Sequence, residues 1–189
     1  MGLDERIYRA LYGGDAPGFL TVVMLALSVI GSGWAALALA PLIGLRRTRR
    51  FALTLAAACI VQSLLVFVIK ILVARVRPWR ALAMHPPVTS PPTDFSFPSG
   101  HAAGSFTVAV FVATVCLSTP TLRGRRFYAA IAVTLAFAIS FSRVYLGVHY
   151  PGDVTAGALL GSAIGFFAAR FFCAKERVRN AAPNLEQPR

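Results

Sequence analysis

Residues 51–69 read FALTLAAACIVQSLLVFVI, nineteen residues without a charged side chain. At a rise of about 1.5 Å per residue, a helix of this length crosses a hydrocarbon layer about 30 Å thick. The whole chain has the same character, because 57% of its 189 residues are hydrophobic and only 14% are charged. This composition excludes an ordinary soluble domain and indicates a protein embedded in a membrane.

Four further apolar segments lie on either side of this one. Two of them, Ala16–Leu45 and Ala102–Leu122, also lack charged side chains. The other two, Phe127–Ser142 and Val154–Ala169, are sixteen residues long and are each followed by an arginine, whose long side chain can reach the lipid headgroups. The sequence therefore predicts an all-α, polytopic transmembrane helix bundle of about five spans.

The two ends of the chain are more polar than the spans. Residues 1–18 mix charged and apolar side chains and close with a Gly-Gly pair and a proline, which favours a short interfacial helix; a solvated tail is the alternative. Residues 19–173 are expected to form the transmembrane domain. Residues 174–189 are expected to form a disordered cytoplasmic tail.

Basic residues gather on one side of the predicted bundle. They follow the first, third and fifth spans: Arg46, Arg47, Arg49, Arg50, Arg123, Arg125, Arg126, Lys175, Arg177 and Arg179. The positive-inside rule makes this side cytoplasmic, so a multi-pass protein of the cell (inner) membrane is expected, with its N-terminus outside and its C-terminus inside. This distribution explains most of the net charge of +12, and no nucleic-acid partner is expected.

Three polar segments lie at the opposite ends of the spans, and the first is Lys70-x6-Arg77-Pro78. If the helix continued to Arg77, Lys70 and Arg77 would share one face and Arg75 would point away from it. Pro78 disfavours helical geometry in the residue before it, so the helix is expected to end near Arg77. Taken alone, the two basic residues could simply snorkel to the membrane surface.

The second segment is Pro98-Ser99-Gly100-His101, directly before an apolar span. Pro98 suits a first helical turn, while Ser99 and Gly100 would offer backbone N–H groups and a hydroxyl at a helix N-terminus, which suits a phosphate. An ordinary capped helix start would explain the proline and the serine. It would not explain the glycine and the histidine.

The third segment, Ser142-Arg143-x5-His149-x3-Asp153, connects the last two spans. Asp153 is expected in the first turn of the last helix, from which its carboxylate can reach back to His149. A carboxylate bonded to one ring nitrogen sets the tautomer and leaves the other nitrogen as a nucleophile or base. The pair indicates catalysis, because a lipid- or anion-binding membrane protein, the non-enzymatic alternative, would not need it.

These three segments resemble the three-part signature of the type 2 phosphatidic acid phosphatase superfamily, and every signature position is matched. The resemblance implies that His149 attacks phosphorus to form a phosphohistidine, that Asp153 orients it and that His101 protonates the leaving oxygen. It also implies a set of residues that hold the phosphoryl oxygens, namely Lys70, Arg77, Ser99, Gly100 and Arg143, and a supporting set, Pro78, Pro98 and Ser142. Larger membrane members of the superfamily have six spans, which leaves the role of the N-terminal segment open.

A metal site is the chemical alternative, built from His85, His101, His149, Asp94 and Asp153. The cations Lys70, Arg77 and Arg143 would oppose a divalent ion beside them, and they can supply the charge neutralisation that Mg²⁺ supplies elsewhere. No metal and no other cofactor is therefore expected, and His85 and Asp94 are expected simply to occupy the loop.

The predicted topology places all three segments at the outer edge of the membrane. A lipid whose tail lies in the bilayer could present its phosphate headgroup there, so the expected partner is a membrane lipid phosphate or diphosphate. Undecaprenyl diphosphate is the first candidate substrate. Within the same superfamily the alternatives are a phosphatidylglycerophosphate or phosphatidate phosphatase, a lipid A or glycolipid phosphatase, and a phosphotransferase. The oligomeric state does not follow from the sequence.

Overall fold

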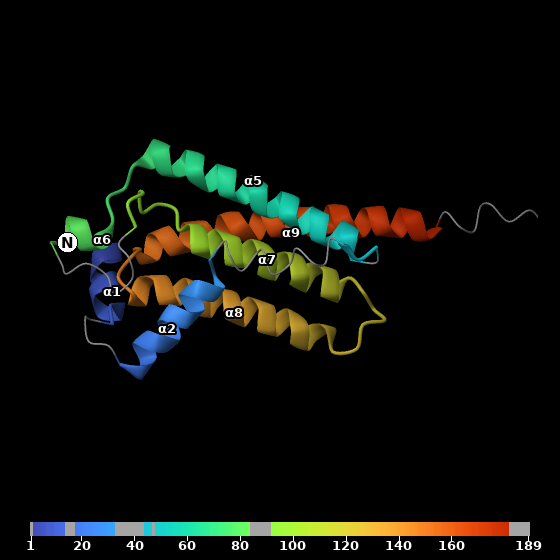
Figure 1. Ribbon diagram of the computed structural model, residues 1–189, viewed down its shortest axis with the longest axis horizontal. Coiled ribbons are helices and arrows are strands. Elements are labelled where there is room, and N and C mark those ends of the chain that lie inside the picture. The colour runs from blue at the N-terminus through green and yellow to red at the C-terminus, as the bar shows by residue number, and fades with distance from the viewer. Residues whose placement is uncertain (1, 14–17, 33–43, 47, 84–91, 182–189) are drawn as a thin grey trace, which may run out of the picture.

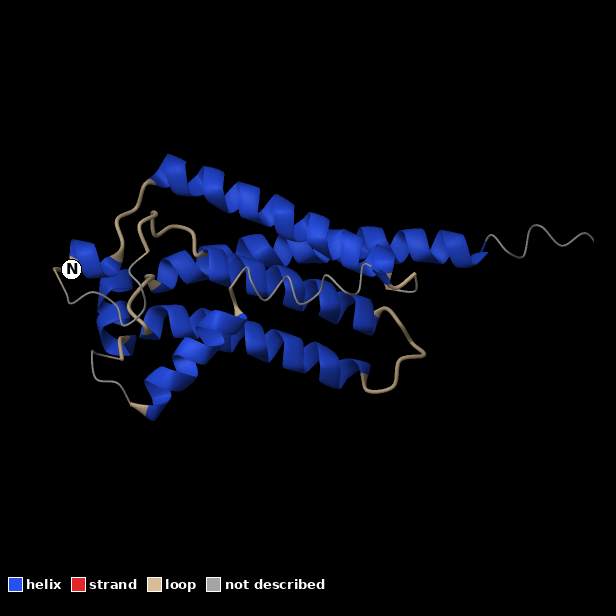
Figure 2. Ribbon diagram, viewed as in Figure 1, coloured by secondary structure: helices blue, strands red, loops and turns tan. Residues whose placement is uncertain are grey.

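The computed structural model describes residues 2–13, 18–32, 44–46, 48–83 and 92–181, and the regular structure in these ranges is helical (Figure 1 and Figure 2). The helices are α1 (Leu3–Leu11), α2 (Phe19–Ile30), α5 (Arg49–Val73), α6 (Pro78–Ala81), α7 (Gly100–Leu117), α8 (Arg125–Tyr145) and α9 (Pro151–Ala181). Within the described ranges, α5, α7, α8 and α9 are long and apolar enough to cross a membrane. The predicted all-α bundle with a short N-terminal helix is confirmed.

The first apolar run differs from the single helix predicted for it. Helix α2 has 12 residues and ends at Ile30, and Gly31 and Ser32 form a turn. Gly31 lies against Ile139 of α8, where a side chain on residue 31 would collide. Residues 33–43 lie outside the described ranges, so four of the five predicted spans are observed as long helices.

Helix α7 lies at the centre of the bundle and packs along both α8 and α9. Small residues allow the backbones of α7 and α9 to touch: a Cβ atom on Gly157 would lie 2.5 Å from the carbonyl oxygen of Ser99. Gly161 and Gly165 meet the carbonyl oxygens of Ala103 and Thr107 in the same way. These three glycines, spaced four residues apart in α9, therefore form a helix-packing face.

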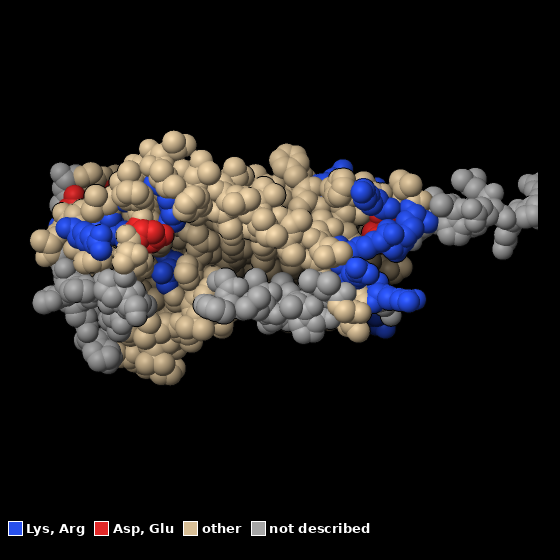
Figure 3. Space-filling view, turned by 45° about the horizontal axis from the view of Figure 1, so that its top comes forward, with Lys and Arg blue, Asp and Glu red and all other residues tan. Residues whose placement is uncertain are grey.

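The two ends of the bundle differ in character. Exposed arginines and one lysine, Lys175, gather at the end where α5 begins and α9 finishes (Figure 3). Helix α9 continues to Ala181, into the segment expected to be a disordered tail, and Glu176 pairs there with Arg179 and lies 3.8 Å from Arg50. At the other end, α1, α6, the last turn of α8 and the starts of α7 and α9 come together (Figure 1).

Candidate active site

The three polar segments meet at the end of the bundle where α8 stops and α9 begins. Arg77, before α6, donates a hydrogen bond from Nη1 to the carbonyl oxygen of Val148 at 2.8 Å. The backbone N–H of Ser99 donates to the carbonyl oxygen of Asp153 at 3.0 Å. Residues more than 50 positions apart in the chain are thereby fixed against one another at one site.

A tight turn between α8 and α9 holds His149 over Asp153. Gly147 has φ +78°, the left-handed conformation that ends α8, and Pro151 begins α9. Asp153 Oδ2 lies 3.6 Å from His149 Nδ1 and accepts a hydrogen bond from the backbone N–H of Tyr150 at 2.9 Å. Both side chains are buried, so the carboxylate can orient the ring through Nδ1 and leave Nε2 for chemistry.

Ser96 contacts both members of this pair, although it lies outside the three sequence segments. It is fully buried, its hydroxyl donates to Asp153 Oδ2, and its oxygen lies 3.5 Å from His149 Nδ1. The only signal was its position three residues before the cap of α7, where a serine is also common in an ordinary loop.

The protonation state of His149 suits a nucleophile. Burial lowers the pKa of His149 to about 4, although the hydrogen bond with Asp153 acts in the opposite direction; the charges of Arg77 and Arg143 lower it further. The imidazole is therefore neutral near pH 7. Its Nε2 atom lies 3.3 Å from Nη1 of Arg77, beside the positive charge that a phosphoryl group would need.

Arg143 has unused hydrogen-bonding capacity in a buried position. It is 5% exposed, its Nη1 donates to the hydroxyl of Ser28 in α2, and its Nε has no hydrogen-bond partner among the described residues. Arg77 and His101 lie close enough to interact with it electrostatically. A buried charge without a full set of partners is costly, so this arrangement suits an anion.

Asp94 does not simply occupy the loop, as expected from the sequence, but pairs with the other two cations, Lys70 and Arg77. Its Oδ2 lies 2.8 Å from Lys70 Nζ, and its Oδ1 lies 2.5 Å from Arg77 Nη2. Burial alone would raise the pKa of the Asp94 carboxyl, but the hydrogen bond with Lys70 and the charge of Arg77 outweigh it and lower the pKa to about 2. The carboxylate thus holds two groups expected to bind phosphoryl oxygens. It is the only acidic residue between Val76 and Phe97, and this was the sequence feature that could have indicated its pairing with nearby cations.

The start of α7 matches the prediction in part. Ser99 caps the helix, since its hydroxyl accepts from the N–H of Ala102 at 3.4 Å, but its own N–H is bonded to Asp153. Helix α7 begins at Gly100, so Pro98 precedes the first turn rather than belonging to it. Among the described residues no partner is found for the N–H groups of Gly100 and His101, which leaves both for an anion.

Helix α5 ends earlier than predicted, and this changes the direction of Arg75. The last helical residue is Val73, and Ala74 has φ 48° in the left-handed region, so the helix does not continue to Arg77. Arg75 does not point away from the site but donates from Nη1 to Asp153 Oδ1 at 2.7 Å. The prediction failed because Pro78 restricts only the residue before it, whereas the actual end is set by tertiary contacts of Arg75.

The supporting residues of the sequence analysis are all buried here. Pro78 is the first residue of α6, and Pro98 packs before α7. The hydroxyl of Ser142 donates to the carbonyl oxygen of Ile139 at 2.6 Å, within its own helix. These three residues shape the backbone around the site.

No grouping of three or more His, Cys, Asp or Glu side chains that could hold a metal ion is found within the described part of the chain. His85, one member of the metal site considered as the alternative, lies outside that part. Asp94, another member, is bound to Lys70 and Arg77.

A helix bundle of membrane-spanning length, with a buried His–Asp pair beside three cations, defines a class of membrane proteins built for phosphate chemistry. The family model of the PAP2 superfamily matches residues 51–177, and the chain belongs to this superfamily. The resemblance inferred from the three sequence segments is confirmed.

Known relatives share this core. The chain is 37% identical over 125 residues to the undecaprenyl-diphosphatase of Sulfolobus acidocaldarius, covering 66% of this chain and 57% of that protein. It is 34% identical over 171 residues to the decaprenylphosphoryl-5-phosphoribose phosphatase of Mycobacterium tuberculosis, covering 87% of each. The crystal structure of a transmembrane PAP2 type phosphatidylglycerolphosphate phosphatase from Bacillus subtilis matches with a TM-score of 0.75 and 30% identity, over 91% of this chain and 85% of that chain. The protein is accordingly a multi-pass membrane protein.

Proposed function

We propose that this protein is a metal-independent phosphatase of lipid-linked phosphates that works through a phosphohistidine on His149. The single observation that carries the proposal is the buried, neutral imidazole of His149, with Asp153 and Ser96 at Nδ1 and Arg77 beside Nε2. In a pocket that only bound an anion, a buried neutral imidazole and its carboxylate would serve no purpose.

The reaction has two steps. Nε2 of His149 attacks phosphorus, the bond from phosphorus to the leaving oxygen breaks, and His101 gives that oxygen a proton. A water molecule then attacks the phosphorus of the phosphohistidine and gives a proton to His101, the P–N bond breaks, and phosphate leaves. Arg143, Arg77 and Lys70 neutralise the charge that spreads over the phosphoryl oxygens, with the N–H groups of α7 as further donors.

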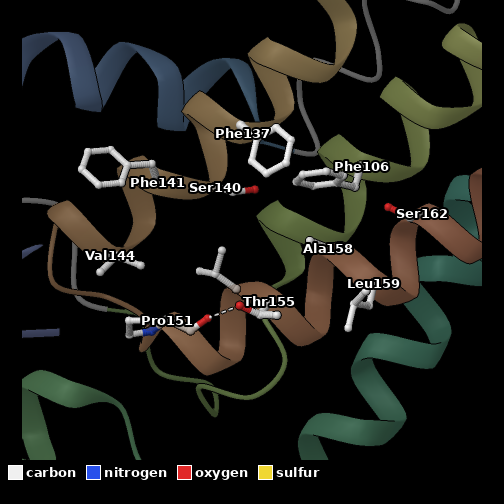
Figure 4. A pocket seen from close by; sticks show the side chains of 11 residues that line it. Phe106, Phe137, Ser140, Phe141, Val144, Pro151, Thr155, Ala158, Leu159 and Ser162 are labelled. Carbon is white, nitrogen blue, oxygen red and sulfur yellow. Dashed lines mark hydrogen bonds between the residues drawn. The ribbon is translucent and has the colours of Figure 1, made fainter. Parts of the chain in front are cut away.

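A groove beside the site supports a substrate with an apolar tail. It has a volume of about 510 Å³ and lies between α7, α8 and α9, where the rings of Phe106, Phe137 and Phe141 line it (Figure 4). Val144 and Pro151, which flank the turn that carries His149, also line it. A lipid whose phosphate lies at His149 could place the first part of its tail in this groove.

The distribution of charge supports one orientation of the protein. The arginines and the lysine at the end where α5 begins favour the cytoplasmic side, so the site faces outward from the cell membrane (Figure 3). The N-terminus is then outside and the C-terminus inside. The site receives the phosphate at the outer surface of the cell membrane.

The first substrate candidate is undecaprenyl diphosphate, the lipid named in the Sulfolobus relative. A polyprenyl phosphosugar with a terminal phosphate monoester is the second, because the Mycobacterium relative named for such a lipid matches over 87% of both chains. Both lipids combine a long apolar tail with an exposed phosphate. Release of phosphate from each, and from phosphatidylglycerophosphate, by purified protein in detergent would separate these substrates.

The mechanism is tested by trapping the intermediate. Quenching the enzyme during turnover of a ³²P-labelled lipid should give an acid-labile phosphoenzyme in the unmodified protein and none in His149→Ala, which should lose about a thousandfold or more in kcat. His85→Ala, a change of the one histidine that the proposed mechanism does not use, is the matched control. Turnover that survives in His149→Ala, or that disappears in EDTA, would overturn the mechanism.

A further inference from the structure

Helix α1 contacts the turn that carries His149, although the role of the N-terminal segment did not follow from the sequence. Tyr8 is fully buried and donates a hydrogen bond from its hydroxyl to the carbonyl oxygen of Gly147 at 3.3 Å. The ring of Tyr12 lies over the same glycine, where a Cβ atom would come within 2.7 Å of it. The N–H of Gly13 donates to the carbonyl oxygen of Tyr145 at 3.0 Å. Helix α1 is thus packed on the whole turn.

One carboxylate of α1 reaches further into the site. Asp4 Oδ1 accepts a hydrogen bond at 2.8 Å from the N–H of Gly152, in the first turn of α9. Its Oδ2 accepts from Arg75 Nη2 at 2.6 Å. The approach is close, since a Cβ atom on residue 152 would lie 2.9 Å from Asp4 Oδ2.

Arg75 connects this carboxylate to the catalytic pair. Its Nη1 donates to Asp153 Oδ1 at 2.7 Å while its guanidinium lies over the ring of Tyr150, 4.0 Å from the ring centroid. Asp153 is fully buried, and its other oxygen faces His149 and Ser96. Arg75 is therefore the group that fixes the oxygen of Asp153 that does not face the imidazole.

We propose that Asp4 and Arg75 are positioning residues for the reaction, acting as one unit that holds Asp153 at the angle from which it orients His149. This role rests on the proposed function, because it assumes that His149 is the nucleophile. Neither side chain contacts Lys70 or Arg143 among the contacts of the described residues, so neither belongs to the phosphate cradle. The unit is formed by an ion pair between the N-terminal helix and the short segment that follows α5.

A positioning role predicts a loss in kcat with little change in KM. Arg75→Ala should lower kcat about tenfold to a hundredfold, the range expected when a hydrogen bond to a charged group is lost. KM should stay within about twofold, because the phosphate cradle is intact. Arg75→Lys should recover part of kcat, since a lysine can bond one carboxylate but not two. Free guanidinium ion should raise the activity of Arg75→Ala, a rescue that a purely structural role would not give.

Asp4→Asn tests the other half of the unit. It should lower kcat by about threefold to tenfold, and adding it to Arg75→Ala should lower kcat no further, because residues that act as one unit are not additive. Glu5→Gln, one position along the same helix, removes an equal charge that is paired with Arg9 and should leave kcat unchanged. Thermal unfolding of each variant, followed by circular dichroism in detergent, identifies any variant that fails to fold.

The outcomes separate the two proposals. If His149→Ala keeps its turnover, the proposed function is wrong whatever Arg75 does. If His149→Ala abolishes turnover and a folded Arg75→Ala keeps full kcat, or raises KM alone, only the positioning role is wrong. Full additivity of the Asp4 and Arg75 changes would overturn the claim that they act together.

Discussion

Replacing Asp94 by asparagine should make the enzyme bind phosphate more tightly. The Asp94 carboxylate holds Lys70 and Arg77 through one oxygen each, at 2.8 and 2.5 Å. A phosphoryl group that uses these two cations must displace the carboxylate or share them with it. Asparagine has a similar shape but no charge, so the variant removes the competitor and keeps the loop.

The size of the effect follows from the ion pairs. Burial alone would raise the pKa of Asp94, but Lys70 and Arg77 lower it from 3.8 to about 2, a net stabilisation of the carboxylate of about 2.4 kcal/mol. The side chain is 54% exposed, so solvent screening reduces this to about 1 kcal/mol. That energy corresponds to a gain in phosphate affinity of about fivefold.

The assay is competitive inhibition by inorganic phosphate at fixed ionic strength. Its inhibition constant should fall about fivefold in Asp94→Asn, while Glu5→Gln, which removes an acidic group from α1 at the same end of the bundle, should leave it unchanged. The assay pH can be chosen freely, because a carboxyl with a pKa of about 2 stays ionised throughout the practical range. An inhibition constant that is unchanged or higher in Asp94→Asn would refute the competition and would make Asp94 a residue that organises the cations.

Three further predictions follow from the described geometry. The acid limb of kcat/KM should lie near pH 4 rather than near 6.5, because protonation of His149 removes the nucleophile; a limb near 6.5 would contradict a buried neutral imidazole. Gly161→Leu should destabilise the protein by about 1–3 kcal/mol in thermal unfolding relative to Gly44→Ala. Residue 161 lies against the α7 backbone, whereas residue 44 has open space. Equal unfolding midpoints would mean that α9 shifts without cost. Ala158→Trp should raise KM for a polyprenyl substrate about tenfold and leave a short-chain phosphate unaffected; equal effects on both would place the tail outside the groove.

The fold was predictable because the membrane imposes a simple rule on composition. A segment of sixteen to about twenty residues without charges has few alternatives to a spanning helix, and α5, α7, α8 and α9 follow this rule. The end of α2 did not follow it, because Gly31 is required by contact with Ile139 of α8 rather than by the hydropathy of the run. Hydropathy predicts that a run of residues forms a helix, and tertiary contacts decide the residue at which the helix ends.

The same distinction applies to the site. Lys70, His149 and Asp153 were predictable because their polarity at helix ends is costly and so demands an explanation. Asp94 and Ser96 lie in a polar loop, where an aspartate or a serine has no cost in free energy. Their presence there therefore does not indicate a functional site. The predicted direction of Arg75 was wrong because it depends on the left-handed conformation of Ala74. This conformation costs roughly 1–2 kcal/mol in a residue with a side chain, and no local sequence feature predicts it. The bonds of Arg75 to Asp4 and Asp153 can offset that cost.

Helices α1 and α2 lie before residues 51–177, the part that matches the family, yet both reach the site. Asp4 of α1 accepts a hydrogen bond from Arg75, which also bonds Asp153. The hydroxyl of Ser28 in α2 accepts a hydrogen bond from Arg143. A hydrogen bond to a charged group contributes about 1.5–3 kcal/mol, which corresponds to about tenfold or more in rate when it acts on a catalytic group. Changes in these two helices can therefore alter turnover as much as changes near the signature itself.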